Sequence, residues 1–226
     1  MAHIVLASAS PRRQELLQRM GITEFDIRVP EAEETYPEGL SPRQIVEYIS
    51  REKAEAAAKL CTPEEIVITA DTMVFLDDQR LGKPADEADA AVKLCGADEI
   101  VITADTMVFL DDARLGKPTD EADALRMLTA LQGRHHTVCT GVTVRQGDHT
   151  VTESEETEVI FRPATQRELL AYIATGEPMD KAGAYGIQGK GSLLVEGIRG
   201  DFFNVMGLPL LRLSRMLEQF GITCLG

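Results

Sequence analysis

The thirteen-residue stretch IVITADTMVFLDD occurs twice in this chain without a change, at residues 66–78 and 100–112. The identity extends further, because residues 56–89 and 90–123 align with an offset of 34 and agree at 28 of 34 positions. Solenoids also repeat at fixed periods, but they need about three or more diverged units to bury a continuous core. Two near-identical copies are typical of a tandem duplication inside an existing fold, and an architecture that uses both copies remains the alternative.

Removing one 34-residue copy from the 226 residues leaves 192, which is enough for one complete domain. We therefore predict a single domain over residues 1–226, in which either 56–89 or 90–123 is an insertion. Leaving the apolar side chains of the second copy in water would forgo about 10–20 kcal/mol. We expect the spare strand to join the sheet at an edge, to swap into a second chain, or to be covered by its own helix.

Apolar strand patterns alternate with helix patterns along the rest of the chain. HIVLAS reads as a strand, followed by a helix with Ser10 as N-cap and Pro11 at its first position, and Ser41 precedes a second helix of this kind. EEIVITAD reads as a buried strand that ends at its acid. Residues 135–163 alternate over two long strands joined by a turn at 146–148. The pattern predicts an α/β fold, with a mixed, twisted sheet and flanking helices.

Charge and apolar content exclude several classes of partner. The formal net charge of −14 argues against nucleic acid, because phosphate-backbone binding is driven by basic surface. No apolar run approaches the roughly 20 residues that span a bilayer. The start, MAHIVLASASPRR, has its apolar run before its charges, the reverse of a signal peptide. We expect a cytoplasmic protein without a membrane partner; a homodimer remains open.

The stretch SASPRR leads from the first strand into a helix and carries Arg12 and Arg13 in the first helical turn. Arginines there oppose the helix dipole, which favours an anion at that end. Binding of phosphates through paired guanidinium hydrogen bonds would explain the two arginines. A solvated basic turn is the alternative.

Each copy of the repeat carries a second candidate, the aspartate of ITADT. Asp71 and its twin Asp105 stand where open α/β sheets form a ligand crevice if they end their strands. Such a carboxylate could hold a divalent metal or take a proton from water, and capping a turn is the alternative. Lys83 and its twin Lys117 follow twelve residues later in RLGKP, where a hairpin would return each lysine toward its acid.

The stretch DKAGAYGIQGKGS, residues 180–192, is rich in glycine, which indicates close approach of its backbone to another group. It does not fit the phosphate-binding pattern G-x-x-x-x-G-K-[ST]. Ala184 stands at the first glycine position, and Gly191 replaces the final serine or threonine. We therefore exclude a Walker A loop.

Taken in order, LASASPRRQELL, SREKA, ITADTMV with LGKP, DKAGAYGIQG and VMGLPL resemble the Maf family of nucleotide pyrophosphatases. The fold of that family is related to the inosine-triphosphate pyrophosphatases. The resemblance covers nearly the whole chain apart from one copy of the repeat, and five motifs in the family's order make it specific.

The resemblance implies hydrolysis of a nucleoside triphosphate to the monophosphate and pyrophosphate, helped by a divalent cation, Mg or Mn. The family's general base matches Asp71 and, equally, Asp105. Glu34 matches an acid near the metal, so the implied metal ligands are Glu34 with Asp71 or Asp105. The implied substrate-binding positions are Ser8, Arg12, Arg13, Lys53, Lys83 and Lys117.

Base preference in the family depends on three positions, which here hold Arg12, Thr72 or its twin Thr106, and Gln188. This combination resembles the branch that acts on dTTP and UTP, with modified pyrimidine triphosphates as further candidates. The branch acting on methylated GTP carries an aromatic residue in place of Arg12 and an acid in place of Gln188, and remains an alternative. A glutamine amide offers both a donor and an acceptor to the O4 and N3–H edge of a pyrimidine.

The two copies compete for the catalytic role. Copy one keeps the shortest link to Lys53, whose counterpart in copy two is Glu87. Copy two keeps the unbroken link to the following helix. The sequence favours Asp71 over Asp105 only slightly. A nucleotide-binding regulator that has lost hydrolysis through the duplication is the alternative from another functional class.

Overall fold

The computed structural model describes residues 3–30, 35–37, 39–62, 65–75, 102–110, 113–115 and 117–225, and for 71–75, 102–110 and 113–115 it describes the backbone alone. The strands are β1 (Ile4–Leu6), β2 (Asp26–Ile27), β3 (Ile66–Phe75), β4 (Ile102–Leu110), β5 (Ala113–Leu115), β6 (His135–Gln146), β7 (His149–Phe161) and β8 (Val195–Arg199). The helices are α1 (Pro11–Arg19), α2 (Pro42–Ala58), α3 (Glu121–Leu131), α4 (Gln166–Ile173), α5 (Phe202–Met206) and α6 (Leu210–Glu218). Short 3₁₀ helices are η1 (Glu177–Asp180), η2 (Ala182–Ala184) and η3 (Lys190–Leu194).

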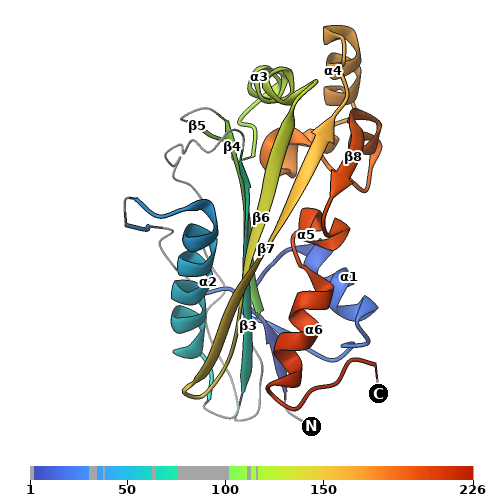
Figure 1. Cartoon of the computed structure of the whole chain (residues 1–226). Helices are drawn as coiled ribbons and strands as arrows, with labels where there is room; N and C mark the ends of the chain where they lie inside the picture. The colour runs from blue at the N-terminus through green and yellow to red at the C-terminus, as the bar shows by residue number, and fades with distance from the viewer. Residues whose placement is uncertain are drawn as a thin grey trace.

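The described strands form one eight-stranded mixed sheet in the order β2-β1-β3-β6-β7-β8, with β4 beside β3 and β5 beside β4. Helix α2 covers one face of the sheet, and α1, α5 and α6 cover the other (Figure 1). Helices α3 and α4 lie at one end of the long β6–β7 hairpin (Figure 1). The α/β fold predicted from the sequence, a mixed sheet with flanking helices, is confirmed.

Local sequence signals place several boundaries. Ser10 and Ser41 are the N-caps of α1 and α2, and each is followed by proline at the first helical position. At Ser41 the side chain accepts from the backbone N–H of Gln44, whose amide oxygen accepts from the N–H of Ser41 at 2.9 Å. This reciprocal capping satisfies donors that helix geometry leaves unpaired. Gly147, with φ of 55°, makes the tight turn between β6 and β7.

The prediction that the strand of copy one ends at its acid is wrong. Strand β3 runs through Asp71 and ends at Phe75, and β4 likewise runs through Asp105 to Leu110. The residues after the acid, TMVF, are β-branched, aromatic and unbranched apolar types that favour strands. β6 pairs with both ends of β3, from Ile66↔Gln146 to Phe75↔Thr137, so the strand has a partner along its length. Neither a strand-end position nor a turn cap describes these aspartates.

The two copies lie side by side as parallel strands in register. Ile68 pairs with Ile102, and Asp71 pairs with its own twin Asp105. β3 also pairs with β1 and with β6, whereas the further partner of β4 is the three-residue β5. Copy two therefore adds strands to the sheet beside copy one, which is the first of the three arrangements expected for a spare copy.

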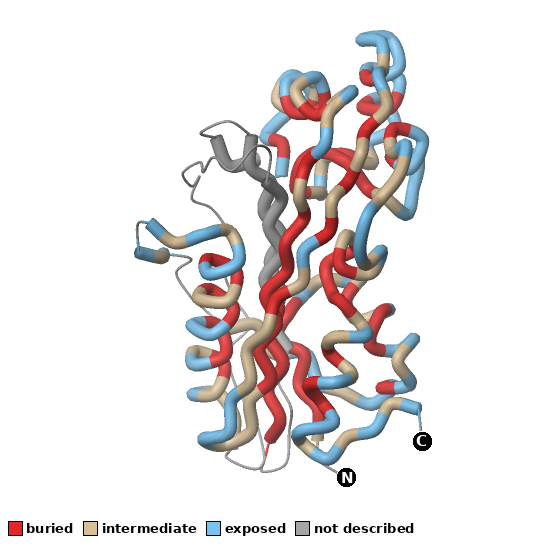
Figure 2. The backbone as a smooth tube through the Cα atoms, in the orientation of Figure 1, coloured by how far each residue is buried: buried red, intermediate tan, exposed pale blue. Residues whose placement is uncertain are grey.

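Two hydrophobic clusters lie along the sheet. One joins α2, α3 and α4 to the first part of β6 and the last part of β7, and includes Val138, Phe161 and Tyr185. The other joins α1 and α6 to β1, β3 and the remainder of β6, and includes Ile68 and Met206. Buried residues follow β1, the first half of β3, and β6 through the middle of the molecule (Figure 2). In the part of the chain that the structure describes, we find no helix that combines the length and apolar character of a membrane span.

Candidate active site

A pocket of about 430 Å³, counting the open space at its mouth, lies where the two hydrophobic clusters meet. Val138 and Tyr185 belong to the first cluster and Met206 to the second, while Ile187 packs against both. The lining residues are Arg12, Val138, Lys181, Ala182, Tyr185, Ile187, Gln188, Val205 and Met206. The pocket therefore combines an apolar floor with a few polar groups, as small-molecule sites commonly do.

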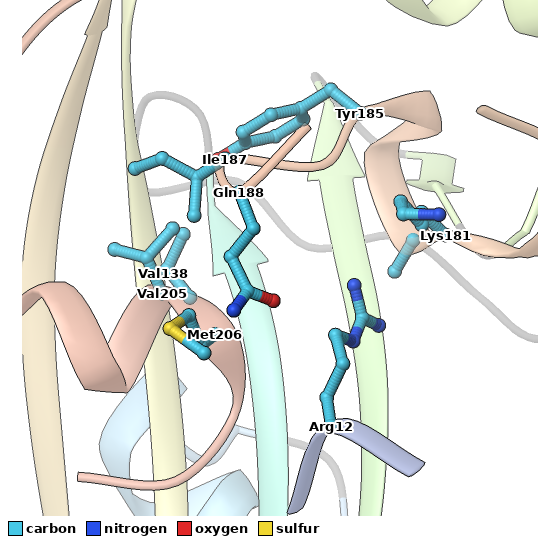
Figure 3. A pocket seen from close by; sticks show the side chains of 9 residues that line it. Arg12, Val138, Lys181, Tyr185, Ile187, Gln188, Val205 and Met206 are labelled. Atoms are coloured by element: carbon cyan, nitrogen blue, oxygen red, sulfur yellow. The ribbon is translucent and has the colours of Figure 1, made fainter. Parts of the chain in front are cut away.

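Arg12 and Gln188 reach this pocket from segments far apart in the sequence. Arg12 comes from the first turn of α1, and Gln188 from the glycine-rich segment between η2 and η3. Their side chains extend toward the same space from opposite sides, with Lys181 beside Arg12 (Figure 3). Two cations and one amide thus surround an apolar floor.

Lys181 is the polar pocket residue that the sequence analysis did not single out. Its Nζ donates to the carbonyl of Glu177 at 2.9 Å and to Oδ1 of Asp180 at 2.6 Å. Burial raises the pKa of Asp180, but the hydrogen bond and charge of Lys181, with the charge of Arg12, outweigh it and hold that pKa below its ordinary value. Asp180 is therefore ionised, and its charge offsets part of the positive charge that Arg12 and Lys181 bring to this wall of the pocket.

The turn between β1 and α1 is anchored by Arg13. Arg13 is 2% exposed, and its Nε donates to the carbonyl of Gly207 at 2.8 Å while Nη1 donates to Oγ of Ser8 at 3.4 Å. Ser8 Oγ also accepts from the N–H of Ser10 at 3.2 Å. The two arginines therefore differ, since Arg13 holds the turn against the segment after α5 and Arg12 lines the pocket.

Helix α2 is fastened to β3 and β6 by buried hydroxyl groups. Ser50 Oγ lies 2.9 Å from Thr69 Oγ1 and 2.9 Å from Thr143 Oγ1, and Thr69 Oγ1 donates to the Ser50 carbonyl at 2.6 Å. Thr69 precedes Asp71 by two residues, and Lys53 follows Ser50 by about one helical turn. The network fixes the backbone at Asp71 relative to the helix that carries Lys53, which is 8% exposed.

The other candidate residues are placed less completely. Asp71 and Thr72 lie in β3, and Asp105 and Thr106 lie in β4, but the side chains of these four are outside the described part. Lys117 is exposed and follows β5, which runs antiparallel to β4 and so returns toward the Asp105 end. Lys83 and Glu34 lie outside the described residues. Among the described candidates, Arg12 and Gln188 line the pocket, whereas Ser8, Arg13, Lys53 and Lys117 are not among its lining residues.

A metal site is not assembled from the described side chains. Within that part of the chain, no three histidine, cysteine, aspartate or glutamate residues gather closely enough to hold an ion. The ligands implied by the resemblance, Glu34, Asp71 and Asp105, have side chains outside the described part. The backbone does bring Asp71 and Asp105 to the same register position of adjacent strands.

The pocket includes residues that sequence reasoning missed, namely Lys181, Tyr185 and the apolar floor from β6 and α5. Tyr185 is buried, and its hydroxyl lies 2.8 Å from Nε2 of buried His136. Ala184, beside it, has φ of 57°, a left-handed conformation that costs a non-glycine residue roughly 1–2 kcal/mol. The glycine-rich motif was the available signal, since strained and glycine-rich backbone often borders a site.

Comparison with known proteins identifies the family. The family model described as "Maf-like protein" matches residues 3–97 and 90–220, and the second match begins where the second copy of the repeat begins. The chain belongs to the Maf-like protein family. Among curated relatives, a protein of Symbiobacterium thermophilum named dTTP/UTP pyrophosphatase is 42% identical over 221 residues, covering 98% of this chain and 95% of the relative.

Two Bacillus relatives carry the same name. The dTTP/UTP pyrophosphatase of Bacillus pumilus is 42% identical over 223 residues, covering 99% of each chain. That of Bacillus cereus is 43% identical over 222 residues, covering 98% of this chain and 97% of the relative. These Maf-like proteins are similar to this chain over nearly its whole length.

Proposed function

We propose that this chain is a nucleoside triphosphate pyrophosphatase, a hydrolase that converts dTTP and UTP to the monophosphate and pyrophosphate. The observation that carries the proposal is the meeting of Arg12 and Gln188 in one pocket with an apolar floor. The relatives named dTTP/UTP pyrophosphatase support the same substrate class. Modified pyrimidine triphosphates are further candidate substrates.

The pocket suits the base of a pyrimidine nucleotide. A flat ring would lie on the apolar floor that includes Val138 and Met206. Gln188 would then donate to O4 and accept from N3–H, which is the pattern of uracil and thymine. Cytosine presents the reversed pair, a donor at N4 and an acceptor at N3, so an amide of Gln188 held in this direction favours UTP and dTTP over CTP.

The positive groups suit the triphosphate. Arg12 and Lys181 form the cationic wall of the pocket, and Ser8 and Arg13 lie in the turn that leads to Arg12. Lys53, with Lys117 or Lys83, would complete the set of substrate-binding residues. A protein of formal net charge −14 must concentrate its cations to attract a highly charged anion, and a local cluster of this kind does so.

Asp71 is the general base of the proposed reaction. It takes a proton from a water molecule, whose oxygen forms a bond to the α-phosphorus. The bond from that phosphorus to the oxygen bridging to the β-phosphate breaks, and pyrophosphate leaves with the electron pair, held by the arginines and lysines. The position of β3 between β1 and β6 supports Asp71 over Asp105, because β1 leads into the turn that carries Ser8 and Arg13.

Carboxylate oxygens suit a divalent metal such as Mg or Mn. Asp71 and Asp105 occupy the same register position on adjacent strands. Glu34 is a third candidate ligand. When bound, the ion would offset triphosphate charge. Copy one then supplies the working strand, and copy two is the insertion within a single domain. We further propose a cytoplasmic location.

The experiment incubates the purified protein with UTP and Mg²⁺ and identifies the products by phosphorus NMR. We expect UMP and pyrophosphate, and no UDP. UDP with orthophosphate would contradict attack at the α-phosphorus. Tight binding of UTP without turnover would instead favour a nucleotide-binding regulator. β4 lies directly beside β3 at Asp71, which is compatible with a duplication that has cost the protein its hydrolysis.

A further inference from the structure

Two side chains outside the pocket hold the segment that carries Gln188, residues 186–191. Tyr172, on α4, is buried, and Glu177 opens η1. The Tyr172 hydroxyl donates to Oε1 of Glu177 at 3.0 Å and accepts from the N–H of Gly186 at 3.1 Å. One hydroxyl therefore links the start of the 186–191 segment to the Glu177 carboxylate.

The Glu177 carboxylate binds the other end of the same segment. Oε2 accepts from the N–H of Lys190 at 2.8 Å, and Oε1 accepts from the N–H of Gly191 at 3.1 Å. Burial raises the pKa of Glu177, but these backbone N–H groups and the Tyr172 hydroxyl outweigh it and hold the pKa below its ordinary value. The carboxylate is thus ionised at neutral pH, when its hydrogen bonds are strongest.

Two glycines of the segment lie so close to these side chains that a Cβ would force a shift. A Cβ on Gly191 would lie 2.6 Å from the Tyr172 hydroxyl, and one on Gly189 would lie 2.5 Å from Oε1 of Glu177. A Cβ on Gly186 would lie 2.7 Å from Cε of Lys181. The backbone therefore rests directly on the Tyr172 and Glu177 pair, and Gln188 projects from it into the pocket (Figure 3).

We propose that Tyr172 and Glu177 are positioning residues that set base selectivity by fixing the 186–191 segment and, with it, the amide of Gln188. Neither residue is among the pocket's lining residues, so both act through Gln188. The inference rests on the proposed function, since it takes Gln188 as the group that reads the base. Loss of one hydrogen bond to a charged group changes an equilibrium by about tenfold or more, and the amide must hold a fixed direction to discriminate.

The test measures kcat and KM for UTP and for CTP in the wild type, Tyr172→Phe, Glu177→Gln and Gly189→Ala. We expect the ratio of kcat/KM for UTP to that for CTP to fall about tenfold in each variant, mainly because KM for UTP rises. A purely structural role would lower kcat for both nucleotides in step with the folded fraction and leave the ratio unchanged.

Two matched controls separate positioning from stability. Glu168 is also a carboxylate that accepts from a backbone N–H, at 2.8 Å from Thr165, but it caps α4 and makes no hydrogen bond to the segment. A Cβ on Gly197 would meet only Ile160 Cδ1, at 4.0 Å. Glu168→Gln and Gly197→Ala should therefore leave the UTP to CTP ratio at the wild-type value.

The variant Gln188→Glu distinguishes failure of this inference from failure of the proposed function. If Gln188→Glu shifts the ratio but Tyr172→Phe and Glu177→Gln do not, although urea melts show both folded, the inference is overturned and the proposed function stands. If the wild type releases no pyrophosphate from any nucleotide, or Gln188→Glu leaves the ratio unchanged, the proposed pocket fails and the inference falls with it.

Discussion

The two copies of the repeat have nearly the same sequence and different places in the fold. β3, from copy one, is paired with β1, β4 and β6, and its residues Ile66, Val67, Ile68 and Ala70 belong to a hydrophobic cluster. β4, from copy two, is paired with β3 and with a three-residue strand. Backbone segments of the same sequence therefore have unequal strand partners. We expect this context, and not intrinsic propensity, to decide which copy does the chemistry.

The largest expected difference between the copies is in core burial. Ile68 is fully buried, so Ile68→Ala should lower the free energy of unfolding by about 3 kcal/mol through lost burial and a cavity. The twin substitution, Ile102→Ala, changes the equivalent residue of copy two and should lower the free energy of unfolding by less than about half as much. Urea denaturation of both variants measures the difference. Equal losses would mean that the copies are equally embedded.

The free energy of unfolding should also depend on pH through His136, a residue outside both copies of the repeat. Burial, with a smaller contribution from the charge of His135, lowers the pKa of His136 from 6.5 to about 3. Because the unfolded chain binds a proton that the folded chain excludes, this contribution is present above pH 6.5 and is lost as the pH falls toward 3. The free energy of unfolding should drop by about 2 kcal/mol by pH 5.

Urea melts across this pH range measure the slope, and His136→Asn should flatten it. The same slope should remain when residues 90–123 are deleted, since β6 carries His136 in either chain. A slope that disappears with the second copy would show that the copies and the β6 region are coupled.

A smaller difference is expected at the buried hydroxyl network. Thr69→Val removes one of the two hydroxyl partners of Ser50 Oγ and the donor to the carbonyls of Ser50 and Thr143, at a cost of about 1–2 kcal/mol. Thr103→Val makes the same change in copy two and should cost less than about 0.5 kcal/mol. Thermal melts of the two variants provide the comparison, and a larger loss at Thr103 would contradict the assignment of β3 as the inner strand.

The smallest effect is expected from removing a whole copy. Deleting residues 90–123 joins Asp89 to Ala124 and recreates the sequence DEADALRML at the start of α3. The shortened chain should keep its free energy of unfolding within about 1 kcal/mol, a small part of the total of about 5–15. Deleting 56–89 instead gives a chain that differs at only six positions and serves as the matched control. Aggregation of both deletion variants would show that the fold requires both copies.

Sequence patterns were sufficient for features that depend on neighbouring residues. Serine followed by proline predicted the starts of α1 and α2, and the alternation around Gly147 predicted the β6–β7 hairpin. The end of β3 was predicted wrongly, because strand-forming residues on both sides of Asp71 leave no local stop signal and the length is set by β6. The short strands β2 and β8 were not predicted, since their pairing partners lie elsewhere in the sheet.

The candidate site divides along the same line. The resemblance to the Maf family predicted Arg12, Thr72 or Thr106, and Gln188 as specificity residues, and the structure brings Arg12 and Gln188 to one pocket. Lys181, Tyr172 and Glu177 were missed, because they act through hydrogen bonds to backbone groups, which no side-chain pattern records. The sequence favours Asp71 over Asp105 only slightly, since the copies are identical around both.

Pyrophosphate release from UTP by the wild type, Asp71→Asn, Asp105→Asn and the double variant tests the central claim most directly. We predict that Asp71→Asn lowers kcat about 10²–10⁴-fold, the usual contribution of a general base, while Asp105→Asn stays within about twofold of the wild type. The reverse pattern would make copy two the working strand. Loss of activity only in the double variant would show that the two copies exchange places, and either result would contradict the assignment of copy one as the working strand.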